Sequence, residues 1–249
     1  QMKKVLIGLA AILASTTVFA ENRYGVGIGA GVSNNIYKGD KTQAYPIPLF
    51  DVDYGNFYLK AATLGYRFYK NDKLSTSIYI DPLAGFPIKG KDMKNGYKNI
   101  DDRDFQVMGG IRLDAETGIY GIRTGLNAQF GEHGAEGRAS LYKMYFANNK
   151  LTIIPGIHFR GFSKHYTDYY FGVTSKEVER SSRDNLKNEY KGGTAYSYGA
   201  VITLDYKLTE NVSLDSFFGI EKFSSDISDS PIVERDWMYM IGGGIKYFF

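Results

Sequence analysis

The chain has 249 residues, with 30 Lys and Arg against 27 Asp and Glu, and it contains no Cys. This charge balance excludes the strongly basic surface of nucleic-acid-binding proteins, and the lack of Cys excludes disulfides and thiolate metal sites. The 21 Tyr, 16 Phe and 29 Gly suit strands that hold aromatic side chains between lipid and water.

The first predicted element is a secretory signal peptide over residues 1–20. Met2, Lys3 and Lys4 form a basic start, residues 5–13 are apolar, and residues 18–20 carry a cleavage site that ends at Ala20. The apolar run is shorter than the about 20 residues that a membrane-spanning helix needs. We therefore expect an exported mature chain, residues 21–249, that forms one domain.

Segments of alternating apolar and polar or small residues follow along the mature chain. In the first of them, Tyr24, Val26 and Ile28 alternate with glycines. Side chains two residues apart share one face of a strand, so each segment predicts a strand with one apolar face. The segments are 24–34, 57–69, 74–84, 105–114, 120–129, 151–160, 196–206, 212–221 and 237–249.

Alternation alone fits both a soluble β-sandwich and a membrane barrel, but the connections distinguish them. Connections 70–73, 114–117, 147–150 and 207–211 are short, whereas 85–104, 163–193 and 224–236 are long. Short turns at one end and long loops at the other are typical of outer-membrane proteins. The sequence therefore predicts an all-β fold: a single transmembrane antiparallel β-barrel with short periplasmic turns and long extracellular loops.

The strand count depends on the segment 45–54. Pro46 and Pro48 would each remove a ladder hydrogen bond from a central strand, so we predict about ten strands without this segment. If the segment does pair, an even count requires one more strand. Twelve strands is then the alternative.

The last segment ends the chain with alternating aromatic residues. Its apolar face carries Trp237, Tyr239, Tyr247 and Phe249. An aromatic carboxyl-terminal strand resembles the signal that the barrel-assembly machinery reads. We therefore expect that machinery as a partner, together with outer-membrane lipid and lipopolysaccharide.

Charged residues on the polar faces are predicted to form a lumen charge network. Buried charges persist only when they are paired or hydrated, so two hypotheses remain: a salt-bridged plug, which we favour, and a thin hydrated channel. The predicted residues are Arg112, Asp114, Arg123, Arg160, Asp205, Asp215, Glu221 and Lys246.

Catalysis and cofactor binding are not expected. His158 alternates onto the lumen face beside Arg160, and His133 lies in a glycine-rich tight turn. His165 has Ser163 and Asp168 near it, but residues this close along one chain seldom form a catalytic triad. We interpret that stretch as a polar loop tip and predict no catalytic residue, metal ligand or cofactor.

Five short segments together give the chain a family resemblance. They are 37–40 (Tyr-Lys-Gly-Asp), 46–48 (Pro-Ile-Pro), 53–55 (Asp-Tyr-Gly), 169–174 (Tyr-Tyr-Phe-Gly-Val-Thr) and 229–233 (Asp-Ser-Pro-Ile-Val). In this order they resemble the MipA/OmpV family of Gram-negative outer-membrane proteins, across the whole mature chain.

The resemblance implies a function as well as a fold. It implies an outer-membrane barrel and a non-enzymatic scaffold that links a murein hydrolase, or transglycosylase, to a murein synthase. Two alternatives remain open: a narrow porin-like solute channel, and an adhesin that acts through its long outer loops. Among these loops, residues 163–193 are the predicted partner-facing feature, with a short helix expected within 175–190.

Overall fold

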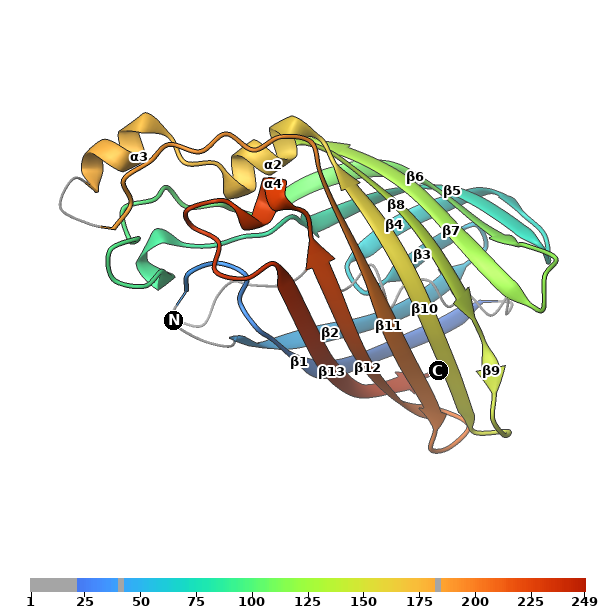
Figure 1. Cartoon of the computed structure of the whole chain (residues 1–249). Coiled ribbons are helices and arrows are strands. Elements are labelled where there is room, and N and C mark those ends of the chain that lie inside the picture. Colours follow the sequence, from blue (N-terminus) through green and yellow to red (C-terminus); the bar gives the residue numbers. More distant parts are fainter. Residues whose placement is uncertain (1–21, 40–42, 182–184) are drawn as a thin grey trace.

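The computed structural model describes residues 22–39, 43–181 and 185–249, so the expected signal peptide at 1–20 lies outside the described residues. The described strands form one antiparallel sheet that closes on itself into a barrel (Figure 1). Neighbours in sequence are neighbours in the sheet: β1 pairs with β13, β8 pairs with β10, and each remaining pairing joins consecutive strands.

The barrel strands are β1 (Arg23–Ser33), β2 (Gln43–Tyr54), β3 (Phe57–Lys60), β4 (Thr63–Lys70), β5 (Leu74–Ala84), β6 (Gln106–Glu116), β7 (Ile122–Gly131), β8 (Gly134–Lys143), β9 (Tyr145–Phe146), β10 (Leu151–Phe162), β11 (Ala195–Lys207), β12 (Val212–Phe223) and β13 (Trp237–Phe248). The helical elements are η1 (Gly90–Asp92), α2 (Lys164–Phe171), α3 (Ser175–Arg180) and α4 (Ser225–Ser228).

The described part of the chain forms twelve barrel strands, because β9 continues β8 along the same edge of β10. Twelve was the alternative count, and the count of ten is wrong. The segment 45–54 does pair, as β2. The predicted strand 57–69 is two strands, β3 and β4, which turn at 61–62, where Ala61 has a φ of 50°. With β8 (Gly134–Lys143), which no predicted segment covers, these two changes raise the nine predicted segments to twelve strands.

The two ends of the barrel differ as predicted. The long connections 85–105, 163–194 and 224–236 and all four helical elements gather at one end, which we call the extracellular end (Figure 1). The short connections 71–73, 117–121, 147–150 and 208–211 lie at the other, periplasmic end. No helix in the described ranges is long and apolar enough to cross a membrane.

Two prolines fit into β2 because half of this strand is an edge. β1 pairs along almost the whole of β2, but β3 pairs only with residues 51–54. The N–H of Ala61 donates to the carbonyl of Phe50 at 2.8 Å, so even-numbered residues of β2 direct their backbone groups away from β1. The N–H groups that Pro46 and Pro48 lack would therefore have pointed to a side with no strand.

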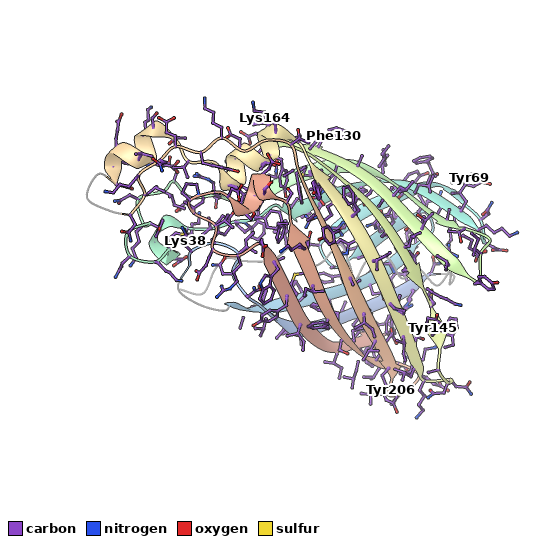
Figure 2. All side chains as sticks on the ribbon, in the orientation of Figure 1. Lys38, Tyr69, Phe130, Tyr145, Lys164 and Tyr206 are labelled. Carbon is purple, nitrogen blue, oxygen red and sulfur yellow. The ribbon has the colours of Figure 1, made fainter. Side chains whose placement is uncertain are left out.

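Apolar side chains cover the outside of the barrel and aromatic residues mark its ends. On β11, Ile202 is 39% exposed and Thr203 is 8% exposed, in agreement with their predicted outward and inward directions. Figure 2 shows Tyr69, Tyr145 and Tyr206 around the periplasmic end. Such a band between aromatic residues is the surface that a lipid bilayer requires.

This facing predicts a difference between neighbouring substitutions on β11. Ile202→Arg should lower the free energy of unfolding by about 2–4 kcal/mol, because it places a charge against lipid near the midplane. Thr203→Arg should be milder, since it points into the lumen toward the Asp205 carboxylate. The measurement is the temperature at which each folded barrel loses its heat-modifiable gel migration. A larger loss for Thr203→Arg would contradict the assigned facing.

Candidate functional site

The extracellular half of the lumen holds a buried charge network centred on Arg160 of β10, which is 4% exposed. Arg160 Nε donates to Glu136 Oε1 of β8 at 2.8 Å, and its Nη1 donates to Glu221 Oε1 of β12 at 3.0 Å. Ser197 of β11 donates to the same Glu221 carboxylate, and His158 Nε2 lies 3.9 Å from it. One guanidinium thus ties together four strands and two buried carboxylates that need a partner.

A second network occupies the periplasmic half, around Asp51 and Asp53 of β2. Lys60 of β3 pairs with both of these carboxylates. Lys246 of β13 lies 3.2 Å from Asp51 and 3.0 Å from Asp215 of β12. This network links the first strands of the chain to the last ones, across the seam where β1 meets β13.

Two small cavities, of about 40 and 20 Å³, adjoin the Arg160 network: His158 lines the larger one, and Glu136 and Arg160 line the smaller one. Both are lined by Arg112 of β6, Asn127 of β7 and Arg138 of β8. A single water needs roughly 10–15 Å³ by this measure, so each cavity has room for only a few waters.

The residues predicted for the lumen network divide into two groups. Arg160 and Glu221 lie in the first network, while Lys246 and Asp215 lie in the second. These four come from β10, β12 and β13. Arg160 forms an ion pair with Glu221, and Lys246 forms an ion pair with Asp215.

The other four predicted residues occupy different surroundings. Arg112 and Asp114 line the larger cavity. Arg123 lies toward the periplasmic rim, where its Nη1 is 3.0 Å from Glu116 Oε1. Asp205 is half-buried on β11. These four therefore do not form a single network with the Arg160 cluster.

Sequence analysis missed Glu136 and Arg138 because residues 131–137 were taken as a loop, whereas β8 begins at Gly134 after a two-residue turn. It also missed Asp51 and Asp53, because the prolines removed their segment from the strand count. A usable signal was present: charges two residues apart, at 51 and 53 and at 136 and 138, have the spacing of one strand face.

The extracellular mouth is closed by a hydrophobic core, which we call the cap. Phe86, from the 85–105 connection, lies at its centre with ring centroids of five other aromatic residues 5.3–6.3 Å away. Arg160 Cζ lies 5.3 Å from the Phe86 ring centre, so the cap rests on the lumen network. Fully buried members include Met93, Tyr166, Tyr170, Phe171, Leu186, Ile227 and Ile232.

The interpretation of residues 163–168 as a polar loop tip is wrong, because α2 occupies this stretch and buries Tyr166 and Thr167 in the cap. Ser163 is the N-cap of α2 and accepts from the N–H of Tyr166. Asp168 Oδ1 accepts from the N–H of Gly192 at 3.1 Å. Ser163 and Asp168, which were considered with His165 as a catalytic triad, therefore hydrogen-bond to backbone groups. His133 stacks on Tyr169, and no metal-binding cluster occurs among the described residues.

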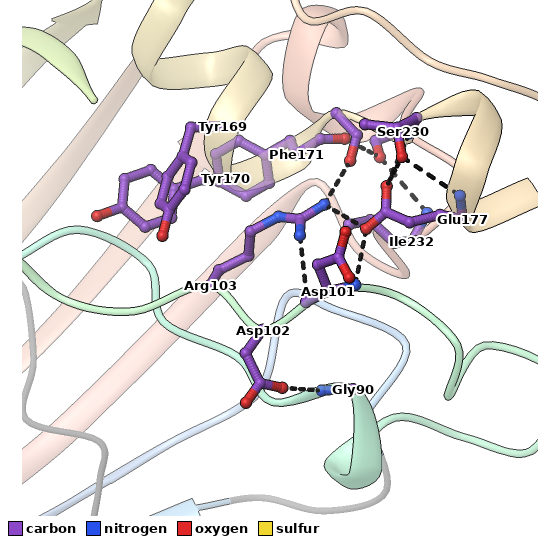
Figure 3. A network of polar contacts seen from close by, with 12 residues as sticks. Gly90, Asp101, Asp102, Arg103, Tyr169, Tyr170, Phe171, Glu177, Ser230 and Ile232 are labelled. Carbon is purple, nitrogen blue, oxygen red and sulfur yellow. Dashed lines mark hydrogen bonds and ion pairs between the residues drawn. The ribbon is translucent and has the colours of Figure 1, made fainter. Parts of the chain in front are cut away.

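A polar clasp joins two loops of the cap (Figure 3). Glu177 of α3 is fully buried, and Arg103 Nη2 donates to its Oε1 at 2.9 Å and to the Gly172 carbonyl at 3.1 Å. The N–H of Asp101 donates to Glu177 Oε1 at 2.8 Å, and the N–H of Thr174 to its Oε2 at 2.7 Å. The carboxylate thus fixes the 85–105 connection to α3.

Three of the segments that carry the family resemblance meet in the cap. Residues 37–39 bridge to 229–233 through the antiparallel pair Tyr37 and Val233. The Tyr37 hydroxyl lies 3.1 Å from the carbonyl of Tyr170, and Ser230 Oγ donates to the carbonyl of Phe171 at 2.6 Å. The resemblance is therefore concentrated where the loops interlock.

The aromatic residues predicted for the assembly signal lie on the outward face of β13 and just beyond its end. Trp237, Tyr247 and Phe249 are 39%, 47% and 78% exposed, and the Trp237 ring centre lies 5.9 Å from that of Tyr239. They are exposed to the surroundings of the barrel. Their use by the assembly machinery stays a prediction.

Removing the central guanidinium should destabilise the barrel strongly. Arg160→Met leaves Glu221 buried without its guanidinium partner and Glu136 with only Arg138, 3.5 Å away, which should cost about 3–5 kcal/mol of unfolding free energy. The readout is the temperature of heat-modifiable migration. As a control, Arg180→Met should cost at most about 1 kcal/mol, since Arg180 and its partner Asp101 are 49% and 59% exposed. Equal losses in the two variants would contradict this ranking.

The clasp should weaken in acid. Burial by itself would raise the pKa of Glu177, but the Thr174 N–H and the Arg103 guanidinium outweigh it and hold this pKa below its ordinary 4.5. The stabilisation is therefore complete above pH 4.5 and is lost as the pH falls through the lowered value. Melting temperatures from pH 7 to pH 3 should drop less for Glu177→Gln than for the native chain, and identical profiles would refute this role.

Comparison with known proteins agrees with this architecture. The profile of the family described as MltA-interacting protein MipA matches residues 26–249. A 24 kDa outer membrane protein of Pasteurella multocida is 33% identical over 91% of this chain and 90% of its own length. The MltA-interacting protein of Escherichia coli is 28% identical over 100% of this chain and 99% of its own length.

The chain is also similar to solved outer-membrane proteins. An outer-membrane channel from Pseudomonas putida F1 aligns with 95% of this chain and 98% of its own, with a TM-score of 0.46 and 9% identity. The barrel, the match along residues 26–249 and the full-length relatives agree. The chain therefore belongs to the MipA family of Gram-negative outer-membrane β-barrel proteins.

Proposed function

We propose that this protein is a non-enzymatic outer-membrane scaffold that holds a murein transglycosylase at its periplasmic rim. The observation that carries the proposal is closure. The cap fills the extracellular mouth with fully buried aromatic and aliphatic side chains, and ion pairs bridge the inner wall below it. A closed, stiff barrel suits anchoring better than solute passage.

Family membership supports the choice of partner. The Escherichia coli relative is named for its interaction with MltA, a murein transglycosylase, and it matches this chain along its whole length. We extend that interaction to this chain and, through the same resemblance, to a murein synthase. Both enzymes act on murein, which lies on the periplasmic side of the barrel.

The periplasmic rim offers one turn with the features of a contact site. In the connection 117–121, Ile119 is 58% exposed and Tyr120 is 86% exposed. Tyr120 has a φ of 47°, which is a strained conformation for a residue other than glycine. Gly118 and Gly121 on either side also have positive φ, and the N–H of Ile122 donates to the Ile119 carbonyl at 2.8 Å. The turn thus presents two apolar side chains on a hydrogen-bonded backbone.

We expect Tyr120→Ala to weaken retention of the transglycosylase about tenfold or more, the loss typical of a contact hot spot. The measurement is retention of the purified enzyme on the immobilised barrel in detergent. Tyr196→Ala is the matched control, because Tyr196 is 48% exposed at the extracellular end of β11 and should not alter binding.

Two outcomes would reject the scaffold. The first is no retention of the enzyme by the native barrel. The second is steady conductance of the native barrel in planar bilayers without enzyme binding, which would favour the narrow channel instead. Retention that is unchanged in Tyr120→Ala would keep the scaffold but place its contact elsewhere on the rim.

A further inference from the structure

A row of three polar side chains crosses the inner wall of the barrel at one level. Arg112 of β6 is opposite Asn127 of β7, and Asn127 is opposite Arg138 of β8. All three line both of the small cavities beside the Arg160 network. Because neighbouring strands lie about 4.8 Å apart, the backbones that carry the two arginines are roughly 10 Å apart. We call these three residues the guanidinium row.

Neither arginine of the guanidinium row is fully matched by the protein around it. Among the described residues, no carboxylate lies within ion-pair distance of Arg112, whose Cζ is 5.5 Å from the Tyr79 ring centre. The Arg138 side chain is 9% exposed, and its Nη2 lies 3.5 Å from Glu136 Oε1. Its Nε has no hydrogen-bond partner in the described part of the chain. A buried donor of this kind calls for a water molecule or an ion.

The charges around the larger cavity favour an ion over water. Two guanidinium groups line this cavity, against the single carboxylate of Asp114. Glu136 and Glu221 already receive hydrogen bonds from Arg160. Water can accept the unused N–H groups, but it leaves the repulsion between two like charges in place. An anion between the guanidinium groups satisfies the donors and opposes that repulsion as well.

A glycine provides the space for such an ion. Gly125 of β7 lies two residues from Asn127, opposite both Asp114 and Ser140. A Cβ at Gly125 would lie 2.7 Å from Ser140 Oγ and 3.3 Å from Asp114 Oδ1. The larger cavity measures about 40 Å³, whereas a single water needs roughly 10–15 Å³, and a chloride ion is only slightly larger than a water molecule. The cavity therefore has room for one small anion and a water molecule.

We propose that the guanidinium row binds a small monovalent anion of the halide class in the larger cavity. Arg112 and the Nε of Arg138 donate to it from the two ends of the row. Asn127 Nδ2 donates one N–H to the Tyr79 hydroxyl at 3.0 Å, which leaves its second N–H for the ion. The anion joins β6 to β8 from inside the wall. This role is independent of the rim contact with the transglycosylase.

Replacing chloride at constant ionic strength tests the proposal. The barrel is refolded in detergent in either potassium chloride or potassium gluconate, because gluconate is too large for the cavity. The midpoint temperature of heat-modifiable migration should be a few degrees higher in chloride and should rise with the logarithm of the chloride concentration, since a ligand of the folded state stabilises that state. Arg112→Met should lose this response.

Asn127→Asp tests the same site without removing a guanidinium group. Its carboxylate would lie between the two arginines and would supply the anion covalently. The variant should therefore melt at nearly the same temperature in both salts, and at a higher temperature than the native chain in gluconate. Asn148→Asp is the matched control. Asn148 is exposed in the 147–150 turn, where its Oδ1 accepts from the N–H groups of Lys150 and Leu151, so this variant should keep the native chloride response.

Bromide locates the ion directly. In crystals grown in bromide, the anomalous density should show a peak between the side chains of Arg112 and Arg138. Equal melting temperatures of the native chain in chloride and gluconate, without such a peak, would overturn the proposal and leave the cavity to water. A chloride response that persists unchanged in both Arg112→Met and Asn127→Asp would place the effect elsewhere on the protein and would also overturn it.

Discussion

The double engagement of Arg160 is the interaction on which the rest of the barrel interior depends. Its guanidinium forms ion pairs with Glu136 and Glu221, both nearly inaccessible to water, and its Cζ lies 5.3 and 4.8 Å from the ring centres of Phe86 and Phe162 at the base of the cap. A carboxylate in a dry environment is stable only beside a cation, and an aromatic core can pack over charges only when they are already paired. One residue thus meets both requirements and joins the lumen to the cap.

The same distribution of charge relates the structure to the proposed function. Ion pairs occupy the inner wall, the cap closes the outer mouth, and Glu177 and Arg103 fix the loops to each other. The molecule leaves its periplasmic rim exposed, where the 117–121 turn presents Ile119 and Tyr120. A scaffold needs a rigid body and an accessible contact surface, and this barrel offers both. Neither of them requires an open axial channel.

The errors of the sequence analysis have identifiable physical origins. Pro46 and Pro48 argued against β2 because a proline removes a hydrogen bond from a paired strand, yet the partner on that side is absent in the extracellular half. The split of 57–69 into β3 and β4 depends on the left-handed backbone conformation of Ala61. Glycine and asparagine are the residues that usually indicate this conformation in a sequence, and neither stands at this position. Burial of α2 depends on Phe86 and Ile232, which come from other loops. The first and the last of these outcomes were set by segments distant in sequence, and the second by a local backbone conformation.

The sequence by itself determined the fold class, the facing of the strands and the asymmetry of the two ends, because period-two alternation and connection length are local properties of the chain. It also identified Arg160, Glu221, Asp215 and Lys246, since each alternates onto a polar strand face. Tertiary structure alone decided which charges pair and that the loops condense into a cap. These features require strand register and loop packing, which bring together residues such as Lys60 and Asp51, or Arg103 and Glu177, from separate elements. Alternation assigns a side chain to a face, but only the closed barrel gives that side chain its partner.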